Sequence, residues 1–160
     1  MTRESFWTKI EVEKETKKMV RQLSVFIQNK SGKIASVTRT LYQNGIDIRA
    51  LSVADTADFG ILRMLVSDVE KARTALANEN CIVSVNEVDV VAVPDRPGGT
   101  AEVLQRLAEA NIDIEYMYSL IDRGTSDAYM VFRLSDEANT NNVLEELGLK
   151  TVPGKMLGLN

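Results

Sequence analysis

The chain has 160 residues, of which 44% are hydrophobic and 26% charged, and it carries a formal net charge of −4 with no histidine. The acidic balance argues against a nucleic-acid-binding surface, which is normally basic, and no apolar run approaches the roughly 18 residues of a membrane span. Without histidine, every histidine-dependent catalytic triad is excluded and the commonest metal ligand is missing. The single cysteine, Cys81, cannot form an internal disulfide, so we expect a cytoplasmic protein and interpret Cys81 as a small core residue.

The first 18 residues are rich in charge and resemble no later part of the chain. Charged termini are commonly poorly ordered, and this one lacks the apolar core of a secretory signal. We therefore interpret residues 1–19 as a disordered or extraneous tail. The alternative is a docking arm that uses Phe6 and Trp7.

Residues 20–86 predict six elements in the order strand, helix, strand, strand, helix, strand. Apolar residues alternate from Leu23 to Ile27, as in a strand, and then recur at helical spacing from Ile34 to Leu41. Gly45 ends this helix, since glycine readily takes the left-handed conformation that follows a helix. The remaining elements are strands over residues 46–54 and 59–67, a helix that begins after Asp68, and a strand over residues 81–85.

Residues 87–153 repeat this order. Residues 28–33 align with residues 94–99 at an offset of 66, and the same offset places Leu41 on Leu107. After the second strand the offset becomes 68, as a two-residue insertion in a strand–strand turn would produce. A repeat this regular predicts two copies of one small domain, followed by a C-terminal tail over residues 154–160.

Each copy reads β-α-β-β-α-β, which predicts an α+β protein of two tandem ferredoxin-like domains, each an antiparallel sheet with helices on one face. In the third strand, Leu62, Met64 and Val66 fit the helix-covered face, whereas Ile61 and Leu65 point to the helix-free face. An uncovered apolar face is usually an interface. We expect the two copies to pack together and the chain to form a homodimer.

Residues 93–98, followed by residues 107–114, resemble the ACT domain, a small ligand-binding regulatory module. Residues 29–32 with residues 44–48 resemble a second copy, and the resemblance covers about residues 20–152. It is closest to small stand-alone tandem ACT proteins with no catalytic domain. It implies a protein that is not an enzyme and that binds a free amino acid at a domain or subunit interface. We expect an aromatic or branched-chain amino acid and no cofactor or metal.

The resemblance places the ligand at the turn between the first strand and the first helix of a copy. Backbone N–H groups at a helix N-terminus would face the ligand carboxylate, and carboxylates near the turn would hold its ammonium group. The alternative interpretation gives the glycines a role in a tight turn alone and makes the acidic residues caps or solvated edge residues. The predicted ligand-binding residues are Asp95, Pro97, Gly98, Gly99 and Asp113 in the second copy, which we favour, and Asn29, Gly32 and Asp47 in the first.

Four other residues stand out on the strands. Tyr116 and Tyr118 share one strand face, where we expect core packing rather than ligand contact. Arg63 and Arg133 lie on the face opposite the helices, where an ion pair or an interface contact is expected rather than anion binding.

Four functions remain as alternatives at this point. The leading one is an amino-acid-binding regulator, and the second is a regulatory subunit that docks on a separate metabolic, biosynthetic enzyme. A hydrolase of the acylphosphatase type would need an arginine-rich phosphate loop, for which residues 29–32 are a poor substitute. An RNA-recognition module of similar topology would need exposed aromatics and basic charge.

Overall fold

The computed structural model of the chain describes residues 19–55, 58–120, 127–135 and 140–159, so the predicted tail lies outside the described residues except for Met19. The first elements are β1 (Val20–Gln28), α2 (Lys33–Gln43), β2 (Ile48–Asp55), β3 (Phe59–Val66) and α3 (Val69–Asn78). They are followed by β4 (Ile82–Pro94), α4 (Gly99–Glu109), β5 (Ile114–Leu120), β6 (Asp127–Leu134), α5 (Thr140–Glu146) and the short 3-10 helix η1 (Gly154–Leu157). The predicted order of elements is confirmed, although the last strand is reduced to a single bridge between Thr151 and Val91. None of the described helices is long and apolar enough to cross a membrane.

The strand β4 belongs to both copies. Its residues from Ile82 to Val88 pair with β1, and those from Asp89 to Pro94 pair with β6. The strand predicted over residues 81–85 therefore continues into the first strand of the second copy, because the backbone ladder runs on through the polar residues that interrupt the apolar pattern. The expected domain boundary after residue 86 falls inside this strand. We refer to residues 19–88 as unit one and to residues 89–159 as unit two.

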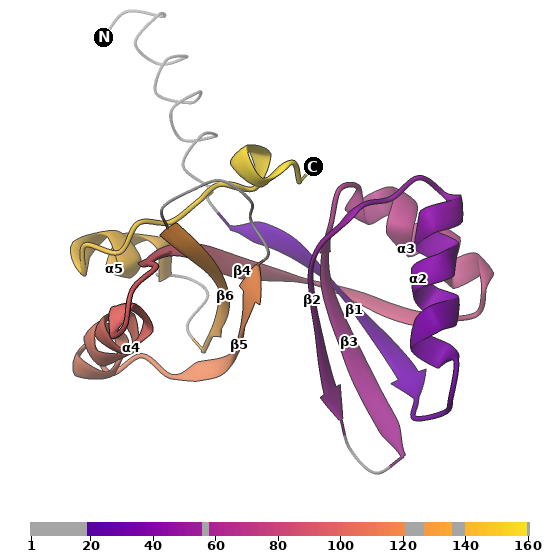
Figure 1. Cartoon of the computed structure of the whole chain (residues 1–160), viewed down its shortest axis with the longest axis horizontal. Coiled ribbons are helices and arrows are strands. Elements are labelled where there is room, and N and C mark those ends of the chain that lie inside the picture. The colour runs from indigo at the N-terminus through magenta and orange to yellow at the C-terminus, as the bar shows by residue number, and fades with distance from the viewer. Residues whose placement is uncertain (1–18, 56–57, 121–126, 136–139, 160) are drawn as a thin grey trace, which may run out of the picture.

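All six strands form one antiparallel sheet in the order β2-β3-β1-β4-β6-β5, with one pair of helices over each half (Figure 1). In unit one, Leu62, Met64 and Val66 pack in the core beneath the helices, as predicted. The matching core of unit two contains Val103 and Leu107 of α4. Each half of the sheet therefore has its own hydrophobic core on its helix side.

The helix-free faces of the two halves pack against each other. Along β4, Val83 and Val85 belong to the core of unit one and Val91 to that of unit two, whereas Val88 and Val90 point to the other side. The sheet curls until β2 and β5, its two edge strands, are in contact. The two copies thus pack together, as predicted, around a third apolar cluster. Its buried members are Val20, Ala50, Leu65, Val88, Val90, Leu120, Val131, Val152 and Leu159.

The C-terminal segment closes one end of the space between the units. Residues Gly154–Leu157 form η1, and Leu159, which is 7% exposed, belongs to the third cluster. A Cβ atom on Gly158 would lie 2.8 Å from Nη2 of Arg49 in unit one. The segment predicted only as a tail is therefore packed on both units.

Candidate functional site

The strand–helix turns of the two units have the same backbone geometry. Gly32 and Gly98 are the N-caps of α2 and α4, and both are left-handed, with φ of 83° and 89°. Three backbone hydrogen bonds recur at the offset of 66. In unit one, the N–H group of Lys30 donates to the carbonyl of Gln28, that of Lys33 to Lys30, and that of Ser36 to Gly32. In unit two, the N–H group of Arg96 donates to the carbonyl of Pro94, that of Gly99 to Arg96, and that of Glu102 to Gly98. Because L side chains rarely take this φ, both glycines are explained by the turn itself.

No side chain caps either of these two helices. By contrast, the helix α3 is capped by Asp68, whose Oδ1 accepts a hydrogen bond of 3.0 Å from the backbone N–H of Lys71. The first N–H groups of any α-helix lack intrahelical partners and carry the positive end of the helix dipole. At α2 and α4 the first N–H group, of Lys33 and of Gly99, is used within the turn, so the second and third N–H groups of each helix are the ones available to a carboxylate.

Gly99 has a steric role that the sequence did not show. It is buried, and a Cβ atom built there would lie 2.0 Å from the carbonyl oxygen of Pro94. At Gly98 the nearest atom to such a Cβ is Nη1 of Arg96, at 4.0 Å. There is therefore room for a ligand beside Gly98. Gly99, in contrast, is needed because α4 begins in close contact with the end of β4.

The acidic residues predicted for unit two lie at opposite ends of α4. Asp95 precedes this helix and Asp113 follows it, and both are exposed. Eleven helical residues separate them by about 16 Å, so they cannot hold the same small ligand within one unit. The same separation by α2 applies to Asn29 and Asp47.

In unit one, the two predicted polar residues already have partners. Nδ2 of Asn29 donates to Oδ1 of Asp55 at 3.1 Å, and Oδ2 of Asp47 lies 3.3 Å from Nε of Arg49. Pro97, the remaining predicted residue of unit two, is exposed in its turn. The predicted residues therefore lie in two separate groups in each unit, one at each end of the helix.

A cavity of about 740 Å³ lies beside the turn of unit one, and we call it the unit-one cavity. It is bounded by the ends of β1 and α3, the starts of β3 and β4, and one side of α2. Lys33 and Glu79 bring opposite charges to it, and Ser36 and Thr40 bring hydroxyl groups. Its apolar lining is Phe26, Ile27, Val37, Phe59 and Ile82. A cavity with both charges, hydroxyls and an apolar wall suits a small zwitterion with an apolar side chain.

The matching region of unit two is crossed by a side chain. Arg106 takes the place of Thr40 at the offset of 66, and its Nη1 donates to the carbonyl of Leu147 at 3.1 Å. Glu102 takes the place of Ser36, and its carboxylate binds Nη2 of Arg96 at 2.6 and 2.9 Å. In unit two these charged side chains satisfy each other and the backbone where unit one has a cavity.

The family of the chain follows from this repeated architecture together with the comparison of its sequence. A family model described as an ACT domain pair matches residues 18–158. The chain belongs to this family. The resemblance seen in the two turns is therefore confirmed over nearly the whole of the described chain.

Solved structures with the same architecture support the assignment of the fold. Protein BT0572 from Bacteroides thetaiotaomicron is 37% identical, with a TM-score of 0.80, over 88% of this chain and 96% of its own. The ligand-free regulatory subunit of aspartate kinase from Thermus thermophilus is 16% identical, with a TM-score of 0.54, over 79% of this chain and 91% of its own. The latter likeness shows the fold alone. None of the curated proteins matches the sequence.

None of the predicted ligand-binding residues lines the unit-one cavity. Lys33, Ser36 and Thr40 are spaced three and four apart, so helical periodicity places them on one face of the predicted helix. That signal was present in the sequence of this ACT domain pair. The approach of Glu79 from the end of α3 is a tertiary feature that no local pattern shows.

The remaining predictions concern residues outside the cavity or at its edge. Cys81 is half-buried and lines the cavity while packing against the core of unit one, so the predicted core role is confirmed in part. Tyr116 and Tyr118 pack against the apolar cluster between the units, as predicted. Arg133 makes the expected ion pair, with Glu115, and Arg63 makes the expected interface contact, with Tyr116 of the other unit.

Proposed function

We propose that this ACT domain pair is a small regulatory protein that binds a free amino acid at its strand–helix turns, with the unit-one cavity as the principal site. The observation that carries the proposal is that Lys33 and Glu79 both line a cavity beside the uncapped start of α2. The ligand carboxylate would meet Lys33 and the second and third N–H groups of the helix. Its ammonium group would meet Glu79, and its side chain would lie against Ile27 and Val37, the apolar lining residues on the helix side of the sheet.

The apolar wall favours an aromatic or branched-chain amino acid. The cavity, at about 740 Å³, is within the size range of small-molecule sites, so it has room for an amino acid of either class. The acidic residues Asp95 and Asp113 define a second candidate site, which would need a partner unit or chain to be complete. Unit one would therefore bind the amino acid by itself, whereas unit two would bind it only with a partner unit or chain.

A thermal-shift screen of the twenty amino acids followed by calorimetry tests this proposal. A ligand at a hundred times its Kd stabilises a protein by about 2.7 kcal/mol, which raises the melting temperature measurably. Lys33→Gln should weaken binding by roughly ten- to a hundredfold, since a hydrogen bond to a charged group contributes about 1.5–3 kcal/mol. Lys71→Gln, which changes an exposed lysine of α3, is the matched control.

The same titration separates the two sites. If Asp95→Ala weakens binding while Lys33→Gln leaves it unchanged, the principal site is in unit two. If no amino acid shifts the melting temperature, the proposed function is wrong.

We also propose that the chain forms a homodimer through unit one. The strand β2 is at the edge of the sheet, and its Leu51 and Val53 are 43% and 42% exposed, whereas edge strands are usually protected by charge. Tyr42 of α2 is 81% exposed. Sedimentation should show a dimer at micromolar concentration, and Val53→Lys should shift it toward monomer. A monomeric parent protein that copurifies with a large enzyme would instead favour the alternative of a regulatory subunit.

A further inference from the structure

We propose that the space between the two units holds a second binding site, for a small carboxylate with a short apolar tail. A cleft of about 210 Å³ opens between the helix-free faces, and we call it the inter-unit cleft. It lies near Phe26, whereas the C-terminal segment closes the space at the other end of β1, beside Val20. It shares only Phe26 with the unit-one cavity, so its ligand is independent of the function proposed above.

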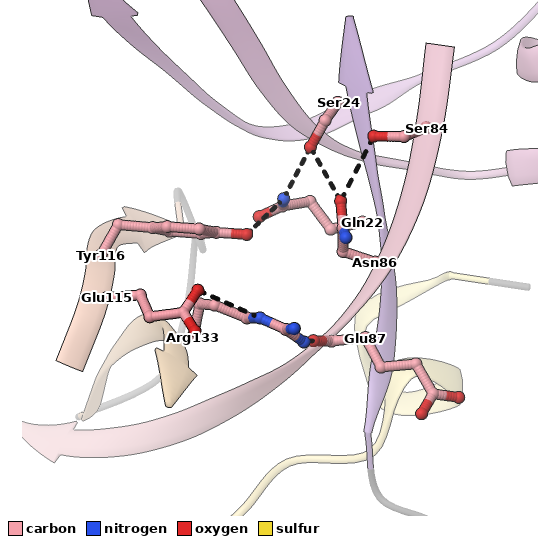
Figure 2. Close-up of polar contacts among 8 residues, drawn as sticks. All are labelled: Gln22, Ser24, Ser84, Asn86, Glu87, Glu115, Tyr116 and Arg133. Carbon is pink, nitrogen blue, oxygen red and sulfur yellow. Dashed lines mark hydrogen bonds and ion pairs between the residues drawn. The ribbon is translucent and has the colours of Figure 1, made fainter. Parts of the chain in front are cut away.

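Both units build the cleft. Unit one contributes residues of β1, β3 and β4. Unit two contributes residues of β5 and β6, and Figure 2 shows those of β1, β4, β5 and β6. The residues from unit one that carry the argument are Arg63 and Asn86, and those from unit two are Glu115, Tyr116 and Arg133. The cleft exists because the sheet curls, and a ligand there would contact both units at once.

A buried polar network fixes the floor of the cleft. The side chain of Gln22 is fully buried, and its Nε2 donates to Oη of Tyr116 at 2.8 Å and to Oγ of Ser24 at 3.1 Å. Oη of Tyr118 donates to Oε1 of Gln22 at 2.7 Å. Burial raises the pKa of Tyr118, so its phenol stays protonated as this donor. These groups are satisfied by one another and hold the walls in place.

Above this floor, hydrogen-bond donors are in surplus. Oδ1 of Asn86 accepts from the hydroxyls of Ser24 and Ser84, at 3.3 and 3.5 Å (Figure 2). These bonds use the protons of both hydroxyls. Within the described parts of the chain, nothing accepts a hydrogen bond from Nδ2 of Asn86. A ligand that supplies acceptor oxygens would satisfy it.

The charge of the cleft is positive although the whole chain is acidic. Arg133 donates from Nη1 to the carbonyl of Glu87 at 2.7 Å, and its Nε lies 3.5 Å from Oε2 of Glu115 (Figure 2). Arg63 lies 3.9 Å over the ring of Tyr116, and no carboxylate of the described residues pairs with it. An arginine stacked on an aromatic ring keeps its planar donor edge free for a carboxylate. Arg63 therefore presents to the cleft a positive charge that no carboxylate of the described residues pairs with, and an anion would meet it there.

The volume and the apolar wall set the size of the ligand. At about 30 Å³ for each water in the liquid, the cleft has room for roughly seven non-hydrogen atoms. Phe26, which is 46% exposed, and Ile61 form an apolar wall beside the donors. These features fit a monocarboxylate with a short branched tail, for which isovalerate is a suitable probe.

Titration of the full chain with isovalerate, followed by NMR of the backbone amides, tests the site. We expect shifts at Ser24, Ser84, Asn86 and Tyr116 with isovalerate and much smaller ones with isovaleramide, which has the same shape without the charge. Shifts confined to the turns around Gly32 and Gly98 would overturn the proposal and leave the amino-acid site standing. Equal responses to the acid and the amide would overturn the carboxylate assignment.

Variants test the donors directly. Arg63→Met keeps an unbranched side chain over Tyr116 without its charge, and it should lower the affinity for isovalerate at least roughly tenfold. Asn86→Asp keeps the acceptor for both serines but replaces the free donor with an oxygen, and it should abolish binding. Arg39→Met removes an exposed charge from α2 and should leave the affinity unchanged. Unaltered binding by a folded Arg63→Met or Asn86→Asp protein, or an equal loss in Arg39→Met, contradicts the proposal.

Discussion

The two units form the same turn but place different side chains around it. Gly32 and Gly98 share the left-handed conformation, and the same three backbone hydrogen bonds follow each of them. Along the next helix, however, Lys33, Ser36 and Thr40 of unit one correspond to Gly99, Glu102 and Arg106 of unit two. The first set lines a cavity, whereas in the second set Gly99 packs on the carbonyl of Pro94, Glu102 binds Arg96, and Arg106 donates to the carbonyl of Leu147.

The cores of the two units also place different side chains at matching backbone positions. Leu23 of β1 is fully buried in unit one, and Asp89 holds the matching position of β4 in unit two at 2% exposure. Burial raises the pKa of the Asp89 carboxyl to about 6. The backbone features on which the fold depends are therefore common to both units, whereas the side chains beside the turn and in the core have diverged.

The largest expected effect on stability comes from substituting Gly99, the first residue of α4. Gly99→Ala places a methyl group against the carbonyl of Pro94 and should lower the free energy of unfolding by roughly 3 kcal/mol. Lys33→Ala, the matched change in unit one, should alter it by less than about 0.5 kcal/mol because the side chain is exposed. Urea denaturation of both variants measures the difference, and equal effects would show that the two helix starts are equivalent.

Asp89→Asn tests the difference between the cores. The folded carboxyl has a pKa of about 6 and the unfolded one its ordinary 3.8, so the unfolded chain loses the proton first as the pH rises. The Asp89 contribution to stability is therefore most favourable below pH 4, declines up to about pH 6 and is then level. At pH 7 the ionised group costs on the order of 3 kcal/mol.

The variant should therefore be more stable than the parent at pH 7, and this advantage should vanish near pH 4. Denaturation of both proteins across this range gives the difference in unfolding free energy at each pH. A constant difference would show that Asp89 titrates normally.

Exchanging the residues at one matching helix position, Thr40 and Arg106, tests whether that side chain decides which unit binds an amino acid. Thr40→Arg introduces into unit one the side chain that crosses unit two, and it should weaken the best amino-acid ligand at least roughly tenfold by filling the cavity. Arg106→Thr removes the hydrogen bond to Leu147 and should add a second, weaker binding event in calorimetry. An Arg106→Thr protein with unchanged stoichiometry would show that space alone does not create the site.

The smallest expected effect concerns residues that belong to neither unit. A chain that begins at Met19 should keep its melting temperature within about 2 °C, because charged terminal segments contribute little packing. Differential scanning calorimetry measures the change. A loss of several degrees would show that Phe6 or Trp7 packs on one of the units.

The order of elements was predictable because apolar periodicity and the fixed offset both report local structure. Leu62, Met64 and Leu65 were assigned to their correct faces by alternation alone. The continuity of β4 was not predictable, since Asn86 and Asp89 interrupt its apolar pattern. Asn86 points into the inter-unit cleft and Asp89 is buried, and both positions depend on how the sheet curls.

The candidate site was predicted less well than the fold. The turns were located correctly, because the left-handed glycine and the strand end leave a recognisable sequence. The open cavity is in unit one, although unit two has the closer match to the family motif. What decides this is the reach of Arg106 to the carbonyl of Leu147, a contact across 41 positions of the chain that no local pattern contains.

The shared strand β4 makes the two units intolerant of single-residue insertions and deletions between them. Six positions separate Val85, in the core of unit one, from Val91, in the core of unit two, and side chains on a strand alternate with a period of two. An even spacing keeps both pairs of helices on the same side of the strand. Loss of one residue near Val88 would turn the core of unit two toward unit one and its helix-free face toward α4. Evolutionary changes in the length of this segment should therefore occur in pairs of residues, whereas the loops elsewhere are free to change by one.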